Sequence, residues 1–240
     1  MFDPNYLLSK TIIVVPCFNA EKTILNTVND IKSVGYTNIL ICDDASTDNT
    51  VEIVKTIENI HLIEHSQNKG YGGNQKTLYN EALKLNYDFV IMVHGDHQYD
   101  PLSIPSLSWL LYAASYDVVM GSRILGGHPL KNGMPVYKYI SNRILTYFQN
   151  IITGYKLSEY HSGLRAYKTT TLRAIDFNHF SDSFIFVNQL ILKCMKLKLK
   201  FGEITCQTKF NHLTSSISFK NSILYGLGII KYSILYVLKK

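Results

Sequence analysis

The H-G-D-H-Q-Y-D-P motif at residues 94–101 contains the side chains best suited to hold a metal ion. Asp96 and Gln98 lie two residues apart after an apolar run, so both can turn an oxygen toward one cation. Hard cations such as Mn²⁺ and Mg²⁺ take oxygen ligands and accept phosphate oxygens in their remaining positions. Such a cation would neutralise a leaving nucleoside diphosphate. The alternative is a polar turn before a helix, with Asp100 as its cap, which leaves Asp96 and Gln98 unexplained.

A pair of acidic residues, Asp43 and Asp44, ends another apolar run. The polar residues 46–50 that follow are explained as a helix cap, because their side-chain oxygens can accept free amide N–H groups. Capping does not explain two adjacent carboxylates, which repel each other. One use for an acidic residue at a strand end is to bind a ribose hydroxyl or a base N–H. We therefore expect this pair to bind a nucleotide.

Basic residues that suit phosphate recur farther along the chain. Guanidinium groups bind phosphate in bidentate fashion, although any single basic residue is more often a surface charge. Arg123 is favoured because it follows a predicted strand, and Lys138, Arg143 and Arg165 are further candidates. The glycine-rich residues 68–74 precede a helix and would allow close approach to a phosphate, but they match neither a P-loop nor a dinucleotide fingerprint.

The elements that must position these residues alternate in type. Apolar runs predict strands, and between them the apolar spacing predicts helices, which together indicate an α/β fold with an open, mostly parallel sheet. In such sheets ligands bind beyond the carboxyl ends of the strands. We therefore expect the polar groups 16–19, 43–44, 94–96 and 122–123 to converge on one cleft. The predicted strands are 11–16, 38–42, 60–64, 88–93 and 117–121, and the predicted helices are 21–33, 48–57, 72–85 and 104–114.

The second half of the chain is less regular. Helices are predicted at 136–152 and 183–195 and a late strand at 201–207, while residues 160–168 mix glycine and arginine with strand formers. Residues 222–238 are mostly apolar and precede two lysines, Lys239 and Lys240. An amphipathic helix lying on a membrane surface fits this pattern, and the alternative is a helix packed on the domain or on a second subunit in a homo-oligomer.

Composition places limits on the class of protein. Hydrophobic residues make up 46% of the 240 residues, which is enough to bury a substantial core. The net charge of +6 suits anionic ligands or an anionic membrane face, or is ordinary surface lysine. The four cysteines form no C-x-x-C pair, so a zinc site is not predicted and buried thiols in a reducing cytoplasm are expected. The first ten residues contain no long apolar stretch, so no signal peptide is predicted.

The order of the motifs resembles the family 2 glycosyltransferases, and within them the dolichyl-phosphate mannosyltransferase and polyprenyl-phosphate glycosyltransferase group. The resemblance covers about residues 11–210 and rests on six motifs in order: P-C-F-N-A-E, D-D-A-S-T-D-N-T, N-K-G-Y-G-G-N, H-G-D-H-Q-Y-D-P, G-S-R and S-G-L-R. It implies a GT-A fold, a UDP- or GDP-sugar donor, Mn²⁺ or Mg²⁺, and inversion at the anomeric carbon. It implies no nucleic-acid partner. We expect a GT-A domain over residues 1–215 and a separate helical segment over 216–240.

The resemblance also implies roles for individual residues. Asp96 matches the last Asp of the family's D-x-D motif, and Gln98 matches a second metal ligand. The sequence departs from the pattern at His94, which stands where the first Asp is expected and would reach the metal through nitrogen or water. Arg123 matches a basic residue that contacts phosphate. The nucleotide-binding and phosphate-binding positions are Pro16, Asn19, Glu21, Asp43, Asp44, Lys138 and Arg165.

The identity of the acceptor decides the mechanism. A saccharide acceptor, as in surface polysaccharide assembly, needs a general base, for which Asp182 is the candidate; the alternative for Asp182 is a helix N-cap. A polyprenyl phosphate acceptor is already ionised and needs only cations to hold it. The basic residues and the apolar C-terminal segment favour the lipid acceptor and action at the cytoplasmic face of a membrane. A third hypothesis, prompted by His94, is a non-catalytic module that binds a nucleotide sugar.

Overall fold

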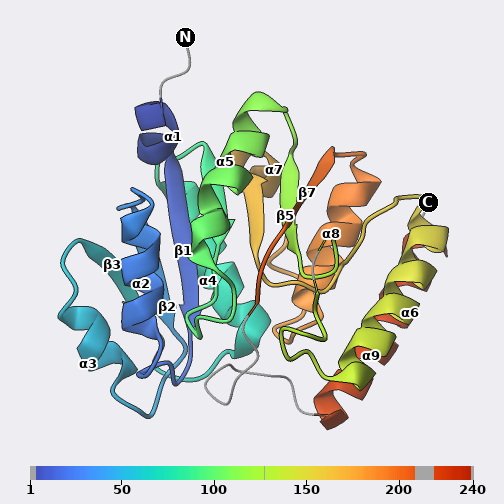
Figure 1. Ribbon diagram of the computed structural model, residues 1–240, viewed down its shortest axis with the longest axis horizontal. Coiled ribbons are helices and arrows are strands. Elements are labelled where there is room, and N and C mark those ends of the chain that lie inside the picture. Colours follow the sequence, from blue (N-terminus) through green and yellow to red (C-terminus); the bar gives the residue numbers. More distant parts are fainter. Residues whose placement is uncertain (1–3, 127, 209–218, 239–240) are drawn as a thin grey trace.

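The computed structural model describes residues 4–126, 128–208 and 219–238, and its centre is a seven-stranded sheet (Figure 1). The strand order is β3-β2-β1-β4-β6-β5-β7. The five strands predicted in the first half are all present, with ends that shift by at most two residues. The strands are β1 (Thr11–Cys17), β2 (Ile39–Asp43), β3 (Ile60–Glu64), β4 (Phe89–Met92), β5 (Val118–Ser122), β6 (Arg165–Lys168) and β7 (Phe201–Thr205).

The sheet is mostly parallel, as predicted, and β6 is the exception. β6 pairs antiparallel with both of its neighbours, and the register places Arg165 opposite Met92 of β4 and Met120 of β5. The amino end of β6 therefore lies at the same edge of the sheet as the carboxyl ends of β4 and β5. Residues that precede β6 consequently meet residues that follow the parallel strands.

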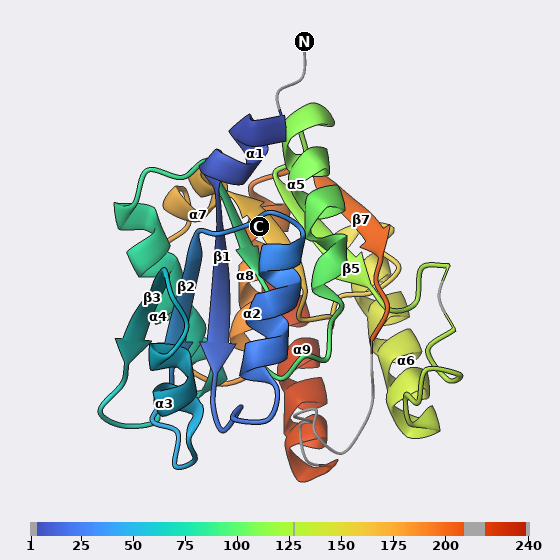
Figure 2. The same ribbon diagram turned by 60° about the vertical axis from the view of Figure 1, so that its left-hand side comes forward.

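Helices cover both faces of the sheet, because strands such as β1, β2 and β4 are mostly apolar and need cover on each side. Side chains of one core cluster come from α1, α2, α3 and α5, and those of the other come from α4, α7 and α8 (Figure 2). The short helices α1 and α7 were not predicted. The bounds are α1 (Pro4–Lys10), α2 (Ile24–Ser33), α3 (Thr50–Lys55), α4 (Gly70–Lys84), η1 (Pro101–Ser103), α5 (Ile104–Ala113), α7 (Thr169–Arg173) and α8 (Phe186–Lys196).

Two long helices, α6 (Val136–Thr153) and α9 (Phe219–Leu238), pack on each other beyond the β7 side of the sheet (Figure 1). α6 ends at Gly154, whose φ of 76° is the left-handed geometry that glycine adopts readily. α9 also contacts α8, so the C-terminal helix is attached to the domain. The expected boundary at residues 215–216, and Lys239 and Lys240, lie outside the described residues.

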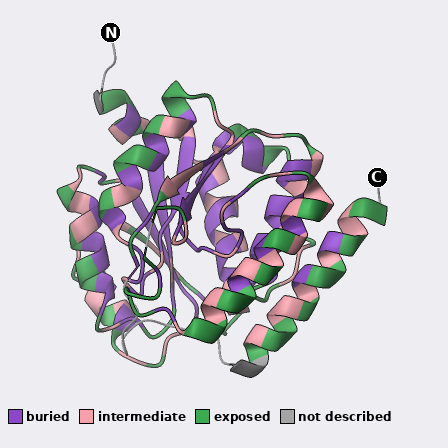
Figure 3. Cartoon of the chain, turned by 45° about the vertical axis from the view of Figure 1, so that its right-hand side comes forward, coloured by how far each residue is buried: buried purple, intermediate pink, exposed green. Residues whose placement is uncertain are grey.

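α6 and α9 are mostly exposed or half-buried, although both are rich in apolar residues (Figure 3). On α6 the exposed apolar residues Ile140, Ile144, Tyr147 and Ile151 follow helical spacing and form one stripe. On α9 the window Asn221–Leu238 is long and apolar enough to cross a membrane by length and composition, and only 11% of it is buried. We refer to the α6 stripe and the exposed apolar residues of α9 together as the two-helix face.

Candidate active site

The carboxyl ends of β1, β2, β4 and β5 open onto one pocket of about 810 Å³. Pro16, Asp44, Asp96 and Arg123, one from each predicted polar group, all line it. The expected convergence of these groups is therefore what the structure shows. α6 and α9 complete the wall of the pocket on the other side, which the sequence did not indicate.

Asp96 and Gln98 lie in the loop that follows β4. Both side chains line the pocket, and both residues are buried, at 9% and 7% exposure. One Asp96 carboxylate oxygen accepts a hydrogen bond from the Gln98 backbone N–H at 3.1 Å, which fixes the turn between them. Among the described residues, no three His, Cys, Asp or Glu side chains are grouped to hold a metal. The carboxylate and amide oxygens nevertheless fit a hard divalent cation that takes its other ligands from a bound diphosphate.

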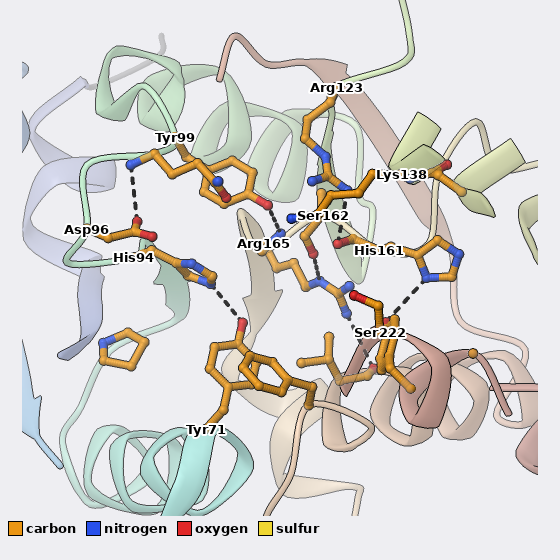
Figure 4. Close-up of a pocket in the computed structure, with 18 of the residues that line it drawn as sticks. Tyr71, His94, Asp96, Tyr99, Arg123, Lys138, His161, Ser162, Arg165 and Ser222 are labelled. Atoms are coloured by element: carbon orange, nitrogen blue, oxygen red, sulfur yellow. Dashed lines mark hydrogen bonds between the residues drawn. The ribbon is translucent and has the colours of Figure 1, made fainter. Parts of the chain in front are cut away.

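His94 lines the pocket, but one of its two ring nitrogens is hydrogen-bonded within the protein. Its Nε2 is hydrogen-bonded to the Tyr71 hydroxyl at 2.7 Å, and burial lowers the pKa of the ring, so the neutral form is favoured (Figure 4). Gly163 packs directly on this nitrogen, since a Cβ at that position would lie only 2.3 Å away. His94 therefore packs within the pocket wall through Nε2, and metal binding by its other nitrogen, or through water, stays a prediction. The second histidine, His97, bonds to Asp30 at 2.8 Å.

The adjacent carboxylates Asp43 and Asp44 each have their own set of hydrogen-bond partners within the fold. Asp43 accepts hydrogen bonds from the backbone N–H and hydroxyl of Ser46. Asp44 contacts His65 Nδ1 at 2.7 Å and accepts the backbone N–H groups of Lys69 and Gly70 at the start of α4. Asp44 lines the pocket, whereas Asp43 is not among its lining residues. Internal hydrogen bonds thus explain the pair that the sequence left unexplained.

Asn19 and Glu21 connect two loops instead of lining the pocket. The Asn19 side-chain oxygen Oδ1 accepts a hydrogen bond from the Thr47 backbone N–H at 2.9 Å. The Glu21 carboxylate accepts hydrogen bonds from the backbone and side-chain N–H groups of Asn49. These bonds hold the loop after β1 against the loop after β2. The two residues therefore shape the region around Pro16 without facing the cavity.

The glycine-rich segment before α4 has a packing function. A Cβ on Gly72 would lie 2.5 Å from the Ser181 carbonyl oxygen, and the Gly72 backbone N–H donates to the Asp182 carbonyl oxygen at 2.7 Å. The helix start thus contacts the chain before α8, where any larger residue would clash. Gly70 still lines the pocket, but the helix amides are already bonded within the protein.

Arg123 forms a buried ion pair with Glu159, a residue that the sequence analysis did not single out. Glu159 is fully buried and also accepts the Arg123 backbone N–H at 2.8 Å and the Asn142 side-chain amide at 2.7 Å. Burial alone would raise the pKa of Glu159, but the Arg123 charge and these hydrogen bonds bring it below its usual value. For Arg123, burial opposes the charge, and Glu159 more than compensates, so its pKa is raised.

The other predicted cations, Lys138 and Arg165, also line the pocket (Figure 4). Burial, and then repulsion from Arg123, lower the pKa of Lys138. Arg165 is 1% exposed and donates to the backbone carbonyls of Ser162, Val187 and Tyr160 at 2.7–3.3 Å. No ion pair between Arg165 and a carboxylate is found in the described parts of the chain. Arg165 is therefore a buried positive charge that donates to three backbone carbonyls and lies beside tyrosine side chains such as Tyr167.

Asp182, the proposed general base, is not brought together with the other candidates. It does not line the pocket, its side chain is 66% exposed, and its carboxylate pairs with Lys76 at 2.5 Å. It is not the cap of α8 either, because that helix begins at Phe186. Its backbone carbonyl instead receives the α4 amides.

Sequence reasoning missed the aromatic and neutral polar part of the site. Tyr71, Tyr99, His161 and Ser162 line the pocket, and the Tyr99 hydroxyl accepts the Gly163 backbone N–H at 2.6 Å. His161 and Ser162 belong to or adjoin the S-G-L-R motif, which was the available signal. Tyr225 and Ser222 of α9 had no signal, because nothing in the sequence places that helix against the pocket.

Comparison with known proteins agrees with this fold and pocket. Residues 12–175 match the family model described as glycosyl transferase family 2. The UDP-N-acetylglucosamine–dolichyl-phosphate N-acetylglucosaminyltransferase of Methanococcus voltae is 30% identical over 91% of this chain and 95% of its own length. The undecaprenyl-phosphate mannosyltransferase of Micrococcus luteus is 26% identical over 70% of each chain. Glucosyl-3-phosphoglycerate synthase from Mycobacterium tuberculosis, solved with Mn²⁺ and UDP, superposes with a TM-score of 0.72 at 16% identity, over 98% of this chain and 84% of that one.

The mostly parallel sheet with helices on both faces, which superposes on that structure, is the GT-A fold. The family match covers more than half of the residues, and the chain therefore belongs to glycosyl transferase family 2. The resemblance noted from the motifs is confirmed at the level of family and fold.

Proposed function

We propose that the protein transfers a sugar from a nucleotide diphosphate sugar to a polyprenyl phosphate, with inversion at the anomeric carbon. The observation that carries this proposal is one pocket that combines the oxygen ligands Asp96 and Gln98 with the cations Arg123, Lys138 and Arg165. Two anionic substrates require such an excess of positive charge. The Methanococcus and Micrococcus relatives, a dolichyl-phosphate N-acetylglucosaminyltransferase and an undecaprenyl-phosphate mannosyltransferase, support the same class of acceptor.

The lining residues divide into a donor side and an acceptor side. Pro16 and Asp44 would contact the nucleoside, with Asn19, Glu21 and Asp43 supporting their loops. Asp96 and Gln98 would hold Mn²⁺ or Mg²⁺, and the bound ion supplies positive charge to the diphosphate leaving group. The structure neighbour solved with Mn²⁺ and UDP supports a divalent ion.

Arg123 and Lys138 would hold the acceptor phosphate so that one of its oxygens attacks the anomeric carbon. The glycosidic C–O bond to the nucleoside diphosphate then breaks, and the nucleoside diphosphate leaves with the bonding electrons. A phosphate monoester is ionised at neutral pH, so no side chain has to remove a proton from it. The exposed position of Asp182 agrees with a reaction that needs no general base.

The two-helix face supports action at a membrane, on its cytoplasmic side. Besides the pocket residue Lys138, residues 124–158 and 219–238 contain five lysine or arginine residues. The two ranges contain no acidic residue. An apolar stripe flanked only by positive charge suits an anionic lipid surface. Tyr137 and Ile144 of α6 and Leu227 of α9 line the pocket as well, so the face continues into it. A polyprenyl chain would thereby reach the acceptor site from the bilayer.

The decisive experiment is a transfer assay with the purified full-length chain, UDP- and GDP-sugars, polyprenyl phosphate in vesicles, and Mn²⁺ or Mg²⁺. We expect a glycolipid product, release of the nucleoside diphosphate, and loss of both when EDTA removes the metal. If donors bind but no glycolipid forms while a saccharide acceptor is glycosylated, the acceptor assignment is wrong. If donors bind without any turnover, the protein is a binding module.

A further inference from the structure

Three buried polar atoms at the pocket wall have no hydrogen-bond partner among the described residues: Ser162 Oγ, His161 Nε2 and Ser222 Oγ. All three residues line the pocket, and Ser162 is only 1% exposed. A buried polar atom without a partner loses its hydrogen bonds to water and regains nothing, which costs free energy. Three such atoms around one cavity indicate groups that a bound ligand satisfies.

These atoms come from two distant parts of the chain that the fold brings together. His161 and Ser162 precede β6, and Ser222 lies in the first turn of α9 (Figure 4). Tyr225 connects the two parts, since its hydroxyl lies 3.3 Å from His161 Nδ1 and its ring meets the imidazole edge-on at 5.8 Å. α9 therefore contributes polar contacts to the site, besides its apolar face.

The chemistry of the three groups suits hydroxyl groups better than phosphate. Burial lowers the pKa of His161 to about 3, against the opposing effect of Glu159 and with added repulsion from Arg123, so its ring is neutral. A neutral imidazole and two serine hydroxyls offer both donors and acceptors, as a sugar hydroxyl does, whereas an ionised phosphate only accepts. The nearby cation, Arg165, donates hydrogen bonds to the backbone carbonyls of Ser162, Val187 and Tyr160.

We infer that His161, Ser162 and Ser222 form a subsite that binds hydroxyl groups of the sugar being transferred. This inference rests on the proposed function, because it assumes a nucleotide-sugar donor. The subsite would bind the part of the donor beyond the diphosphate and so distinguish a nucleotide sugar from the free nucleoside diphosphate. It would also make α9 necessary for donor selection.

The test compares two ligands in calorimetric titrations of the full-length protein with Mn²⁺. The probes are UDP-glucose, UDP-N-acetylglucosamine and GDP-mannose, each paired with UDP or GDP. In Ser162→Ala and Ser222→Ala we expect the Kd of the nucleotide sugar to rise by about three- to tenfold, in line with one neutral hydrogen bond. The Kd of the free nucleoside diphosphate should stay unchanged. His161→Gln, whose amide also donates and accepts, should retain tighter sugar-nucleotide binding than His161→Ala.

Ser233→Ala is the matched control, because Ser233 is a buried serine on the same helix that bonds to Gln149 and does not line the pocket. It should leave the ratio of the two Kd values as in the wild type. Equal effects on nucleotide sugar and nucleoside diphosphate would overturn the inference, as would a rise confined to the KM for polyprenyl phosphate. A wild-type protein that binds no nucleotide at all would overturn the proposed function as well, which separates the two failures.

Discussion

Glu159 holds a fully buried negative charge next to the Arg123 guanidinium, and this pair determines how the pocket wall responds to pH. Replacing Glu159 by Gln would leave Arg123 buried without its anion. Breaking a buried pair in this way costs about 3–5 kcal/mol. We expect Glu159→Gln to lower the free energy of unfolding at pH 7 by about 3 kcal/mol, measured by urea denaturation.

The pH dependence of that loss follows from the direction of the Glu159 pKa. Its pKa is lowered in the folded protein from the ordinary 4.5, so the pair contributes stability above the unfolded value. The contribution is lost as the pH falls through the folded value. The difference in stability between wild type and Glu159→Gln should therefore shrink below about pH 4.5. A difference that stays constant down to pH 3 would contradict the assigned charge state.

Asp96 is the residue whose removal should most affect donor binding with metal. Asp96→Asn removes the anionic oxygen, and we expect kcat/KM for transfer to fall at least about a hundredfold. Loss of a residue that only hydrogen-bonds to a metal ligand already costs up to about a hundredfold, so loss of the ligand itself should cost no less. Asp100→Asn is the matched control, because Asp100 lies in the same loop and caps η1 through an oxygen that Asn retains. Equal losses in both variants would mean that loop structure, and not the metal, explains the effect.

Asp182 provides the test between the two acceptor classes. Its carboxylate is exposed and paired with Lys76, so Asp182→Asn should leave the transfer rate within about twofold and the stability within about 1 kcal/mol. Lys76→Met should also leave the transfer rate within about twofold, but it should lower the stability further, because Lys76 Nζ donates to the Asn178 and Phe180 backbone carbonyls as well. A loss of transfer of more than about a hundredfold in Asp182→Asn alone would restore the general-base role and favour a saccharide acceptor.

At the scale of elements, α6 and α9 carry the exposed apolar residues of the two-helix face. Ile144 and Tyr147 of α6 are 62% and 69% exposed. Burying one such side chain in lipid contributes about 1.5–3 kcal/mol, so Ile144→Glu or Tyr147→Glu should weaken binding to anionic vesicles by roughly tenfold or more in flotation assays. Leu25→Glu on α2, an exposed apolar residue on the far side of the sheet, should have no effect.

The alternative to membrane binding by the two-helix face is a contact between two subunits. If Ile144→Glu leaves vesicle binding intact but converts a dimer to a monomer in analytical ultracentrifugation, the two-helix face is a contact between subunits. Vesicles of neutral lipid should bind less well than anionic ones, because the segments that form this face contain basic residues and no acidic residue.

The elements differ in how far the sequence could predict them. Apolar runs located the parallel strands and their helices, since burial on both faces leaves a continuous signal such as that of β1. The direction of β6 has no such signal, because the residue types of a four-residue strand do not indicate which way it runs in the sheet. The short helices α1 and α7 span too few residues to show a helical period.

The pocket residues that follow the parallel strands were predictable, and those that precede β6 or lie on α9 were not. Asp44, Asp96 and Arg123 each follow a strand directly, so strand assignment alone places them together. His161 and Ser222 reach the pocket, and Glu159 reaches Arg123, only through the packing of α6 and α9 and the reversal of β6. Pairings of this kind depend on tertiary contacts that no local pattern encodes. The explanation of Asp43 by Ser46, which is local, was within reach of sequence reasoning and was missed.

At the scale of the whole molecule, ligand binding should be visible as stabilisation. A ligand at a hundredfold above its Kd adds about 2.7 kcal/mol to the folded state, which for a chain of this size corresponds to a rise in Tm of roughly 5–10 °C. We expect this rise for a nucleoside diphosphate with Mn²⁺ in a thermal-shift assay. EDTA should reduce it sharply, and an unchanged rise in EDTA would mean that the nucleotide binds without metal.

The position of β6 between β4 and β5 has a consequence for how the chain folds. β5 has no partner among the strands before it in sequence, since it pairs only with β6 and β7. During synthesis β5 must therefore wait for residues 165–168 and 201–205 before it can join the sheet, and such distant pairing slows folding. Strands β1 to β4 can assemble early, while β4 keeps an unpaired edge until β6 is synthesised. A ribosome-bound chain stalled before residue 165 should thus be prone to aggregation through the unpaired edge of β4, unless a chaperone covers that edge.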